Sequence, residues 1–137
     1  MKQKIGPDGT YPQGGPLNEF DEGGLNVAFS IVEDKRMAVM HFGTTVKWLA
    51  VPPEVALEQA LFMRERIHEK FGEMSYDATT LPLRVEIDKV KRIITTTMPQ
   101  AAAILAANPE MFLAWAEYLE VAADSLGVTK NGNGQVH

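Results

Sequence analysis

The chain has 137 residues, of which 45% are apolar and 23% charged, the size and composition of one ordinary globular domain. Its formal net charge of −5, from 18 acidic and 13 basic residues, repels phosphate backbones, so we do not expect non-specific binding of nucleic acid. The absence of cysteine excludes disulfides, thiolate metal sites and a cysteine nucleophile. No apolar run approaches the roughly 18 residues of a membrane span and no signal-peptide pattern opens the chain, so we expect a cytoplasmic protein with no membrane partner.

The chain divides into three parts by composition. The predicted organisation is a flexible Gly/Pro-rich arm over residues 1–24, a single α+β domain over 25–127 and a flexible tail over 128–137. Tyr11, Leu17 and Phe20 are apolar side chains in the arm. They either pin the arm to the domain or to a neighbouring subunit, or they are simply exposed.

Three short strands are predicted at the start of the domain. Alternating polarity indicates a strand over residues 25–31, and a polar connection leads to a second strand over 37–42, both of whose faces are largely apolar. Residues 43–45 are suited to a tight reversal, which would lead to a third strand over 46–49. We therefore expect a small antiparallel meander.

The first predicted helix follows Pro52 and Pro53 and covers residues 54–71, with Gly72 as its end. Its apolar stripe consists of Ala56, Ala60, Met63, Ile67 and Phe71. This spacing of three and four residues is typical of a helix packed on a sheet.

A second helix is predicted over residues 82–97. The apolar residues at helical spacing are Leu83, Ile87, Val90, Ile94 and Met98. The alternative is a short strand over residues 83–87, and three threonines at 95–97 weaken the helix. Pro99 should interrupt this segment, whereas the alanine-rich run over 101–107 favours helix again.

The third predicted helix begins at Asn108, Pro109 and Glu110, a strong N-terminal pattern, and ends at Gly127. Its main apolar face consists of Phe112, Trp115, Ala116, Leu119, Ala122, Ala123 and Leu126. A second apolar strip consists of Met111, Leu113, Ala114, Tyr118 and Val121. Because one neighbour would not cover both strips, we expect a homo-oligomer; the alternative is that the second helix and the arm cover the strip within one chain.

Catalytic signatures are missing from the sequence. The histidines His41, His68 and His137 lack the spacing of a zinc motif, and a single Glu-x-x-His at Glu65 lacks the second copy that a di-iron site needs. No nucleophile elbow, phosphate-binding loop or dinucleotide fingerprint occurs. We therefore expect no catalytic residues, no metal, no cofactor and no enzymatic activity.

A polar group around the predicted reversal suggests a site for a phosphate or carboxylate. The candidate ligand-binding residues are His41, Thr44, Thr45, Lys47, Arg64 and Arg92. Hydroxyls, turn amides and cations together suit an anion, provided that the helices bring the arginines to the turn. Turn chemistry and surface solubility explain the same residues without a ligand.

Two stretches, IGPDGTYPQGGPLNEFDEGG and HFGTTVKWLAVPPEVALEQA, carry a resemblance. Over roughly residues 5–62 the chain resembles small uncharacterised accessory proteins of bacteriophages and prophages, in which a glycine-rich arm precedes FG, a WL pair and a PE-x-A helix start. The resemblance implies residence in the host cytoplasm and assigns no activity.

The sequence thus predicts an α+β fold: a small antiparallel β-meander packed on a helix, followed by two further helices. The predicted function is that of a non-enzymatic phage-type accessory protein that acts by protein–protein interaction, as a homo-oligomer or with a host or phage protein. The candidate interface residues are Met111, Phe112, Trp115, Tyr118 and Val121. The alternative is a protein that binds or sequesters a nucleotide or other phosphate-bearing signal. A DNA-binding regulator is a third class, disfavoured because no helix is basic.

Overall fold

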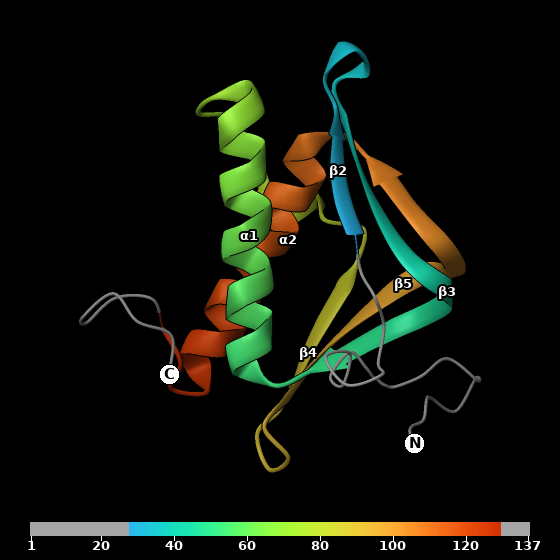
Figure 1. The fold of residues 1–137 in the computed structure, drawn as a ribbon. Coiled ribbons are helices and arrows are strands. Elements are labelled where there is room, and N and C mark those ends of the chain that lie inside the picture. Colours follow the sequence, from blue (N-terminus) through green and yellow to red (C-terminus); the bar gives the residue numbers. More distant parts are fainter. Residues whose placement is uncertain (1–27, 130–137) are drawn as a thin grey trace.

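The computed structural model describes residues 28–129, which form one antiparallel sheet and two helices (Figure 1). The strands are β2 (Ala28–Val32), β3 (Met37–Val51), β4 (Arg84–Asp88) and β5 (Ile93–Ala107). The helices are α1 (Pro53–Phe71) and α2 (Pro109–Ser125), and short 3-10 turns lie at Glu33–Lys35 (η2) and Ala78–Thr80 (η3). The predicted arm over residues 1–24 and nearly all of the predicted tail lie outside the described residues.

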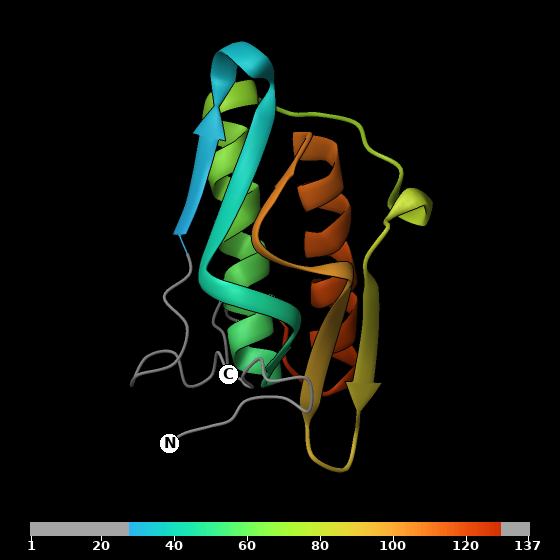
Figure 2. The ribbon, with the colours of Figure 1, turned by 90° about the vertical axis from the view of Figure 1, so that its right-hand side faces the viewer.

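The sheet has the order β2-β3-β5-β4, with every neighbouring pair antiparallel. Both helices lie side by side on one face of the sheet and run in opposite directions (Figures 1 and 2). The core fills the space between this face and the helices. The α+β class is thereby confirmed, with two helices rather than three in the described chain.

The first and last predicted helices are confirmed. The stripe of α1 is buried from Ala56 to Ile67, and the helix ends at Gly72, whose φ of 73° a side chain would strain and whose N–H donates to the His68 carbonyl at 2.8 Å. At the start of α2 the Asn108 side chain accepts a hydrogen bond from the Met111 N–H at 2.9 Å, the expected cap.

The predicted reversal over residues 43–45 is wrong. β3 continues unbroken through it, because Gly43 at φ 79° produces a bend rather than a turn. β5 bends at the same level, next to Pro99, so the two long strands stay paired on both sides of an irregularity. Figure 1 shows this shared bend as the corner of the sheet farthest from the helices. The meander of three strands is therefore a hairpin whose second strand is long and bent.

The predicted second helix over residues 82–97 is also wrong, and the alternative strand interpretation is the better one. β4 and β5 form a hairpin there, closed by Asp88, whose side chain accepts hydrogen bonds from the Val90 and Lys91 N–H groups. Val90, which completed the helical pattern, is 93% exposed in this turn. The alanine-rich run is strand as well, because pairing with β3 outweighs the helix propensity of alanine.

The two halves of the described chain have the same architecture. Each is a hairpin followed by a helix, and Arg84 opens β4 56 positions after Ala28 opens β2. The same offset relates the starts of β3 and β5 and the starts of α1 and α2. We refer to residues 28–71 as the first unit and to residues 84–127 as the second unit.

A pseudo-two-fold axis that passes between strands β3 and β5 relates the contacts between the two units. The register pairs Ala38 with Ala107 at one end and their counterparts, Val51 with Ile94, at the other. Arg64 of α1 bonds to Glu120 of α2, its own counterpart, which places this pair on the axis.

Two arginines repeat the same relation at the ends of the sheet. Arg36 and Arg92 both adopt positive φ, 52° and 57°, in the two hairpin turns. Arg36 pairs with Glu110 at the start of α2, and Arg92 pairs with Glu54 at the start of α1. The units therefore exchange equivalent ion pairs.

Sequence identity between the units is low, and six of the nine identical pairs lie in the hairpin turns and the helices, with the other three in strands. The identical pairs are Ile31 and Ile87, Lys35 and Lys91, Arg36 and Arg92, Leu49 and Leu105, Ala50 and Ala106, Pro53 and Pro109, Glu54 and Glu110, Leu57 and Leu113, and Ala60 and Ala116. The structure thus contains an internal repeat whose two units share few identical residues.

Candidate functional site

The predicted ligand-binding residues of β3 lie at the bend of the sheet. His41, Thr44 and Thr45 are exposed, and the Lys47 Nζ donates to the Pro99 carbonyl at 3.2 Å across the bend. The structure thus brings these side chains to one part of one strand.

The two predicted arginines have contacts elsewhere. Arg64 binds Glu120 between the helices, and the Arg92 Nη1 donates to the Leu126 carbonyl at 2.8 Å beside its pair with Glu54. An anion site at the bend would therefore have to be formed without them, and the ligand hypothesis stays a prediction that rests on the β3 residues.

The predicted interface residues of α2 separate into core and surface. Phe112 and Trp115 are 0% and 1% exposed; Phe112 stacks edge-to-face on Phe29, and the Trp115 Nε1 donates to the Thr96 Oγ1 at 3.0 Å. Both side chains belong to the core of this chain, so they are not available to a partner.

The rest of the second apolar strip of α2 is partly covered by the chain itself. Leu113 and Ala114 are buried, and η3 packs on this helix from the connection that follows α1. Met111 is half-buried, whereas Tyr118 and Val121 are 38% and 62% exposed. Two of the five residues of the strip that suggested a partner are therefore buried within one chain.

A polar network joins the helices to the connection after α1. The Arg64 guanidinium donates to both carboxylate oxygens of Glu120, at 2.6 and 3.0 Å, and to the Tyr76 hydroxyl at 3.1 Å. The Tyr76 hydroxyl in turn donates to Glu117 at 2.7 Å. Every polar group of this chain of contacts thus has a partner.

The electrostatics of the network follow from these contacts. Partial burial of the Arg64 guanidinium opposes its charge, but the hydrogen bonds to Glu120 and Tyr76 outweigh this, so the pKa of Arg64 is raised. Burial, followed by the hydrogen bond to Glu117, raises the pKa of Tyr76. Both groups are thereby held in their ordinary neutral-pH forms, which fits a structural clamp rather than a proton-transfer site.

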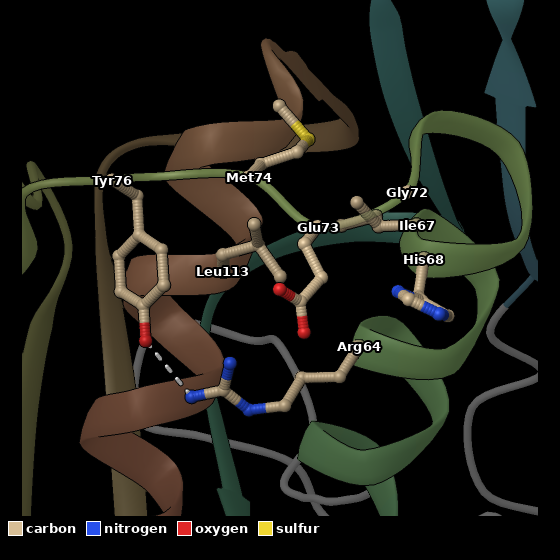
Figure 3. Close-up of a pocket in the computed structure, with 8 residues that line it drawn as sticks. All are labelled: Arg64, Ile67, His68, Gly72, Glu73, Met74, Tyr76 and Leu113. Carbon is tan, nitrogen blue, oxygen red and sulfur yellow. Dashed lines mark hydrogen bonds between the residues drawn. The ribbon is translucent and has the colours of Figure 1, made fainter.

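A hollow of about 310 Å³ adjoins this network (Figure 3). It is lined by Arg64, Ile67, His68, Gly72, Glu73, Met74, Tyr76 and Leu113. Figure 3 shows Arg64 extending from α1 to Tyr76, with Leu113 of α2 behind them. Because the charge of Arg64 is neutralised by Glu120, the hollow has little to hold an anion.

Potential metal ligands do not gather among residues 28–129, where no cluster of three or more His, Asp or Glu side chains occurs. Within the same residues, neither helix is long and apolar enough to cross a membrane.

No described element covers the outer face of the sheet, defined as the side opposite the helices. In Figure 2 the sheet lies in front of both helices, and no described element lies in front of the sheet. Because side chains alternate along a strand, the neighbours of the buried core positions point to this face. On the two long strands they are Met37, Val39, His41, Trp48, Ala50, Ile93, Thr95, Thr97, Ile104 and Ala106.

Charge is scarce on these two strands. Within the 15 residues of β3 and the 15 of β5, Lys47 alone carries a formal charge at neutral pH. Ile104 is 51% exposed, and Trp48 is only half-buried although both lie in the middle of the sheet. A broad, nearly uncharged and partly apolar surface is typical of a protein contact.

The two edges of this face differ. The outward positions of β4 are Arg84, Glu86 and Asp88, whereas those of β2 are Ala28, Ser30 and Val32. Charges on an edge strand discourage pairing with another chain, so the β4 edge is protected and the β2 edge is not. The uncharged surface is thus continuous from β2 across the first half of β3.

The sequence contained a signal for this face that the predicted fold did not use. The strand over residues 37–42 was expected to be apolar on both faces, which in a two-layer fold leaves one apolar face uncovered. The sequence pattern predicts helix where β4 and β5 form a hairpin, and a helix there would not contribute to this face.

No family model, no curated protein and no solved structure matches this chain.

Proposed function

We propose that this chain is a non-enzymatic accessory protein, of the phage type that residues 5–62 resemble, and that it acts by protein–protein contact as a homo-oligomer assembled through the outer face of its sheet. The observation that carries the proposal is the uncharged outer surface of β3 and β5, which no described element covers. Burying such a surface contributes roughly 25 cal/mol per Å² of apolar area.

The character of the surface favours a protein partner over the other classes. A nucleic acid needs a basic surface, and β3 and β5 supply a single lysine, Lys47, whose ammonium group already donates to Pro99. A small ligand needs a concave site with converging polar groups, and the sheet bends away from the helices at its middle, so that its outer side is convex (Figure 1).

A second copy of the same chain is compatible with this surface in charge. In a two-fold interface each patch meets itself, so a charged patch would repel its own copy, whereas an uncharged one does not. Two sheets that pack face to face interdigitate their apolar side chains about 10 Å apart. A host or phage protein with an exposed apolar sheet face is the other partner that this surface suits.

The test is the oligomeric state of the full chain with one substitution on the surface. Ile104→Lys places a charge at a half-exposed position of the outer face. Val90→Lys places the same charge in the turn between β4 and β5, where the side chain is 93% exposed. Sedimentation velocity over a range of protein concentrations should show an oligomer for the wild type and for V90K, and a monomer for I104K.

A wild-type chain that stays monomeric at every concentration would contradict assembly through this face, and so would an I104K oligomer as strong as the wild type. Circular dichroism of I104K is the control, and it should show the same fold as the wild type. The charge is tolerated in the monomer because the position is half-exposed, so the comparison concerns association alone.

A further inference from the structure

The connection between α1 and β4, residues 72–83, is packed over the helical layer rather than loose. Tyr76 bonds to Arg64 and Glu117 across the groove between the helices, and Leu83 is 6% exposed in the core. Asp77 caps η3, accepting a hydrogen bond from the Thr79 N–H at 3.0 Å. This segment thus leads into the second unit as a fixed part of the fold.

The internal repeat extends into the corresponding segment before the first unit. At the same offset of 56, the residues FDEGGLNV at 20–27 align with YDATTLPL at 76–83. An aromatic residue, an aspartate and a leucine recur in order: Phe20 for Tyr76, Asp21 for Asp77 and Leu25 for Leu81. The final position is apolar in both, Val27 and Leu83. The sequence before β2 therefore repeats the positions that fix the later connection.

The helical layer offers the counterpart of the Tyr76 site. A hollow of about 250 Å³ lies between α1 and α2 and is lined by Leu57, Glu120, Val121, Asp124 and Thr129. Leu57 and Glu120 are the counterparts of Leu113 and Arg64 in the hollow of Figure 3. Val121 is 62% exposed there, and no aromatic residue among those described lines this second hollow as Tyr76 lines the first.

The side chains at the two sites change together. Glu117, which accepts the Tyr76 hydroxyl, corresponds to Leu61, which is apolar and half-buried. Tyr76 itself corresponds to Phe20, which has no hydroxyl. The polar pair Tyr76 and Glu117 is therefore matched by the apolar pair Phe20 and Leu61. This is expected if Phe20 contacts Leu61 as Tyr76 contacts Glu117.

We propose that residues 20–27 dock over the groove between α1 and α2, with the Phe20 ring in the second hollow against Leu61 and Val121. The segment joins β2 directly, as residues 76–83 join β4, so it has the same reach to its site. The C-terminal residues 130–137, KNGNGQVH, offer no aromatic and no match to the repeat. This contact lies on the helical side of the molecule and is independent of the proposed assembly through the outer face.

The test is nuclear Overhauser spectroscopy on the full chain, with labelled phenylalanine and tyrosine rings and labelled methyl groups. We expect cross-peaks from the Phe20 ring to the methyl groups of Leu57, Leu61 or Val121, and none from the ring of Tyr11, an aromatic residue that precedes the repeat. Phe20→Ala should shift those methyl resonances, whereas Tyr11→Ala, the matched control, should leave them in place.

Three results would overturn the proposal. They are a Phe20 ring without cross-peaks to the helices, a ring that contacts the outer face at Val39 or Ile104, and cross-peaks that appear only between differently labelled copies in a mixed sample. The same spectra of I104K separate the two proposals, since the Phe20 contacts are expected in a monomer as much as in an oligomer.

Discussion

The two units have the same backbone architecture but different contacts between side chains. In the first unit the helix meets the sheet through Gln59 and Met40, whose Nε2 and Sδ atoms lie 4.0 Å apart. At the equivalent positions of the second unit, Trp115 donates a hydrogen bond to Thr96, a buried polar residue that is 3% exposed. Pairs of contacting residues have therefore been exchanged as pairs, while the strand bounds and helix starts stayed in register.

The same comparison applies to the outer face. Ala28, Ser30 and Val32 of the first unit have the counterparts Arg84, Glu86 and Asp88 in the second. At these positions, which do not pack inside the chain, the first unit is uncharged and the second is charged. The difference suggests that the uncharged half of the sheet is where a partner makes its apolar contact.

The largest effect is expected from breaking the pair that distinguishes the two cores. Trp115→Ala removes a side chain that is 1% exposed and leaves the Thr96 hydroxyl without its donor, which should lower the free energy of unfolding by about 3–5 kcal/mol. Gln59→Ala, at the equivalent position, removes a half-buried side chain with one weak contact and should cost less than about 1 kcal/mol. Urea unfolding followed by circular dichroism measures both.

Equal losses for these two variants would mean that the units are energetically alike despite their different contacts. The slope of the unfolding transition should match that of the wild type in both cases, which shows that the same surface is exposed on unfolding.

A smaller effect is expected from replacing Tyr76 by phenylalanine, the residue type of its sequence counterpart Phe20. Tyr76→Phe removes the hydrogen bonds to Glu117 and Arg64 and should cost about 0.5–1 kcal/mol, the lower part of the usual range because the hydroxyl is half-buried. Because the folded-state pKa of Tyr76 is raised, its contribution is present below the ordinary tyrosine pKa of about 10 and is lost as the pH rises through the folded value.

Urea midpoints of the wild type and Y76F should accordingly differ at pH 7 and converge above about pH 10. A constant difference across that range would show that the tyrosine acts through packing rather than through its hydroxyl.

The smallest effect is expected at the exchanged ion pairs. Arg36 makes two hydrogen bonds to Glu110, at 3.0 and 2.6 Å, whereas Arg92 approaches Glu54 at 3.4 Å and also bonds to Leu126. Glu110→Gln should therefore lower the urea midpoint more than Glu54→Gln, its matched control at the same position of the other helix. Exposure and salt keep both shifts small.

The hydrogen bond from Arg36 lowers the pKa of Glu110, against a smaller opposing effect of burial. Its contribution is therefore present above the ordinary glutamate pKa of about 4.3 and is lost as the pH falls through the lower folded value. Midpoints of the wild type and E110Q should converge as the pH is lowered from about 5 to below about 4. A larger shift for E54Q than for E110Q would reverse the assignment of the stronger pair.

Prediction from the sequence succeeded where local chemistry decides the structure. Asn108 and Pro109 start a helix in almost any context, because a side-chain acceptor and a fixed φ act on their own backbone. It failed between residues 82 and 107, where apolar residues at helical spacing coincided with strand alternation and alanine favoured the wrong element. The candidate site inherited this error, since half of the outer face comes from that segment.

Amphipathic spacing and helix caps predict the α+β class, the two helices with their ends, and their buried stripes, because both act within a few residues. Tertiary structure alone decided that β3 passes through its bend, that β5 is a strand, and that Arg36 and Arg92 reach the opposite units. These features depend on contacts between residues at least 38 positions apart, from Arg92 and Glu54 to Ala38 and Ala107, and no local propensity encodes such a contact.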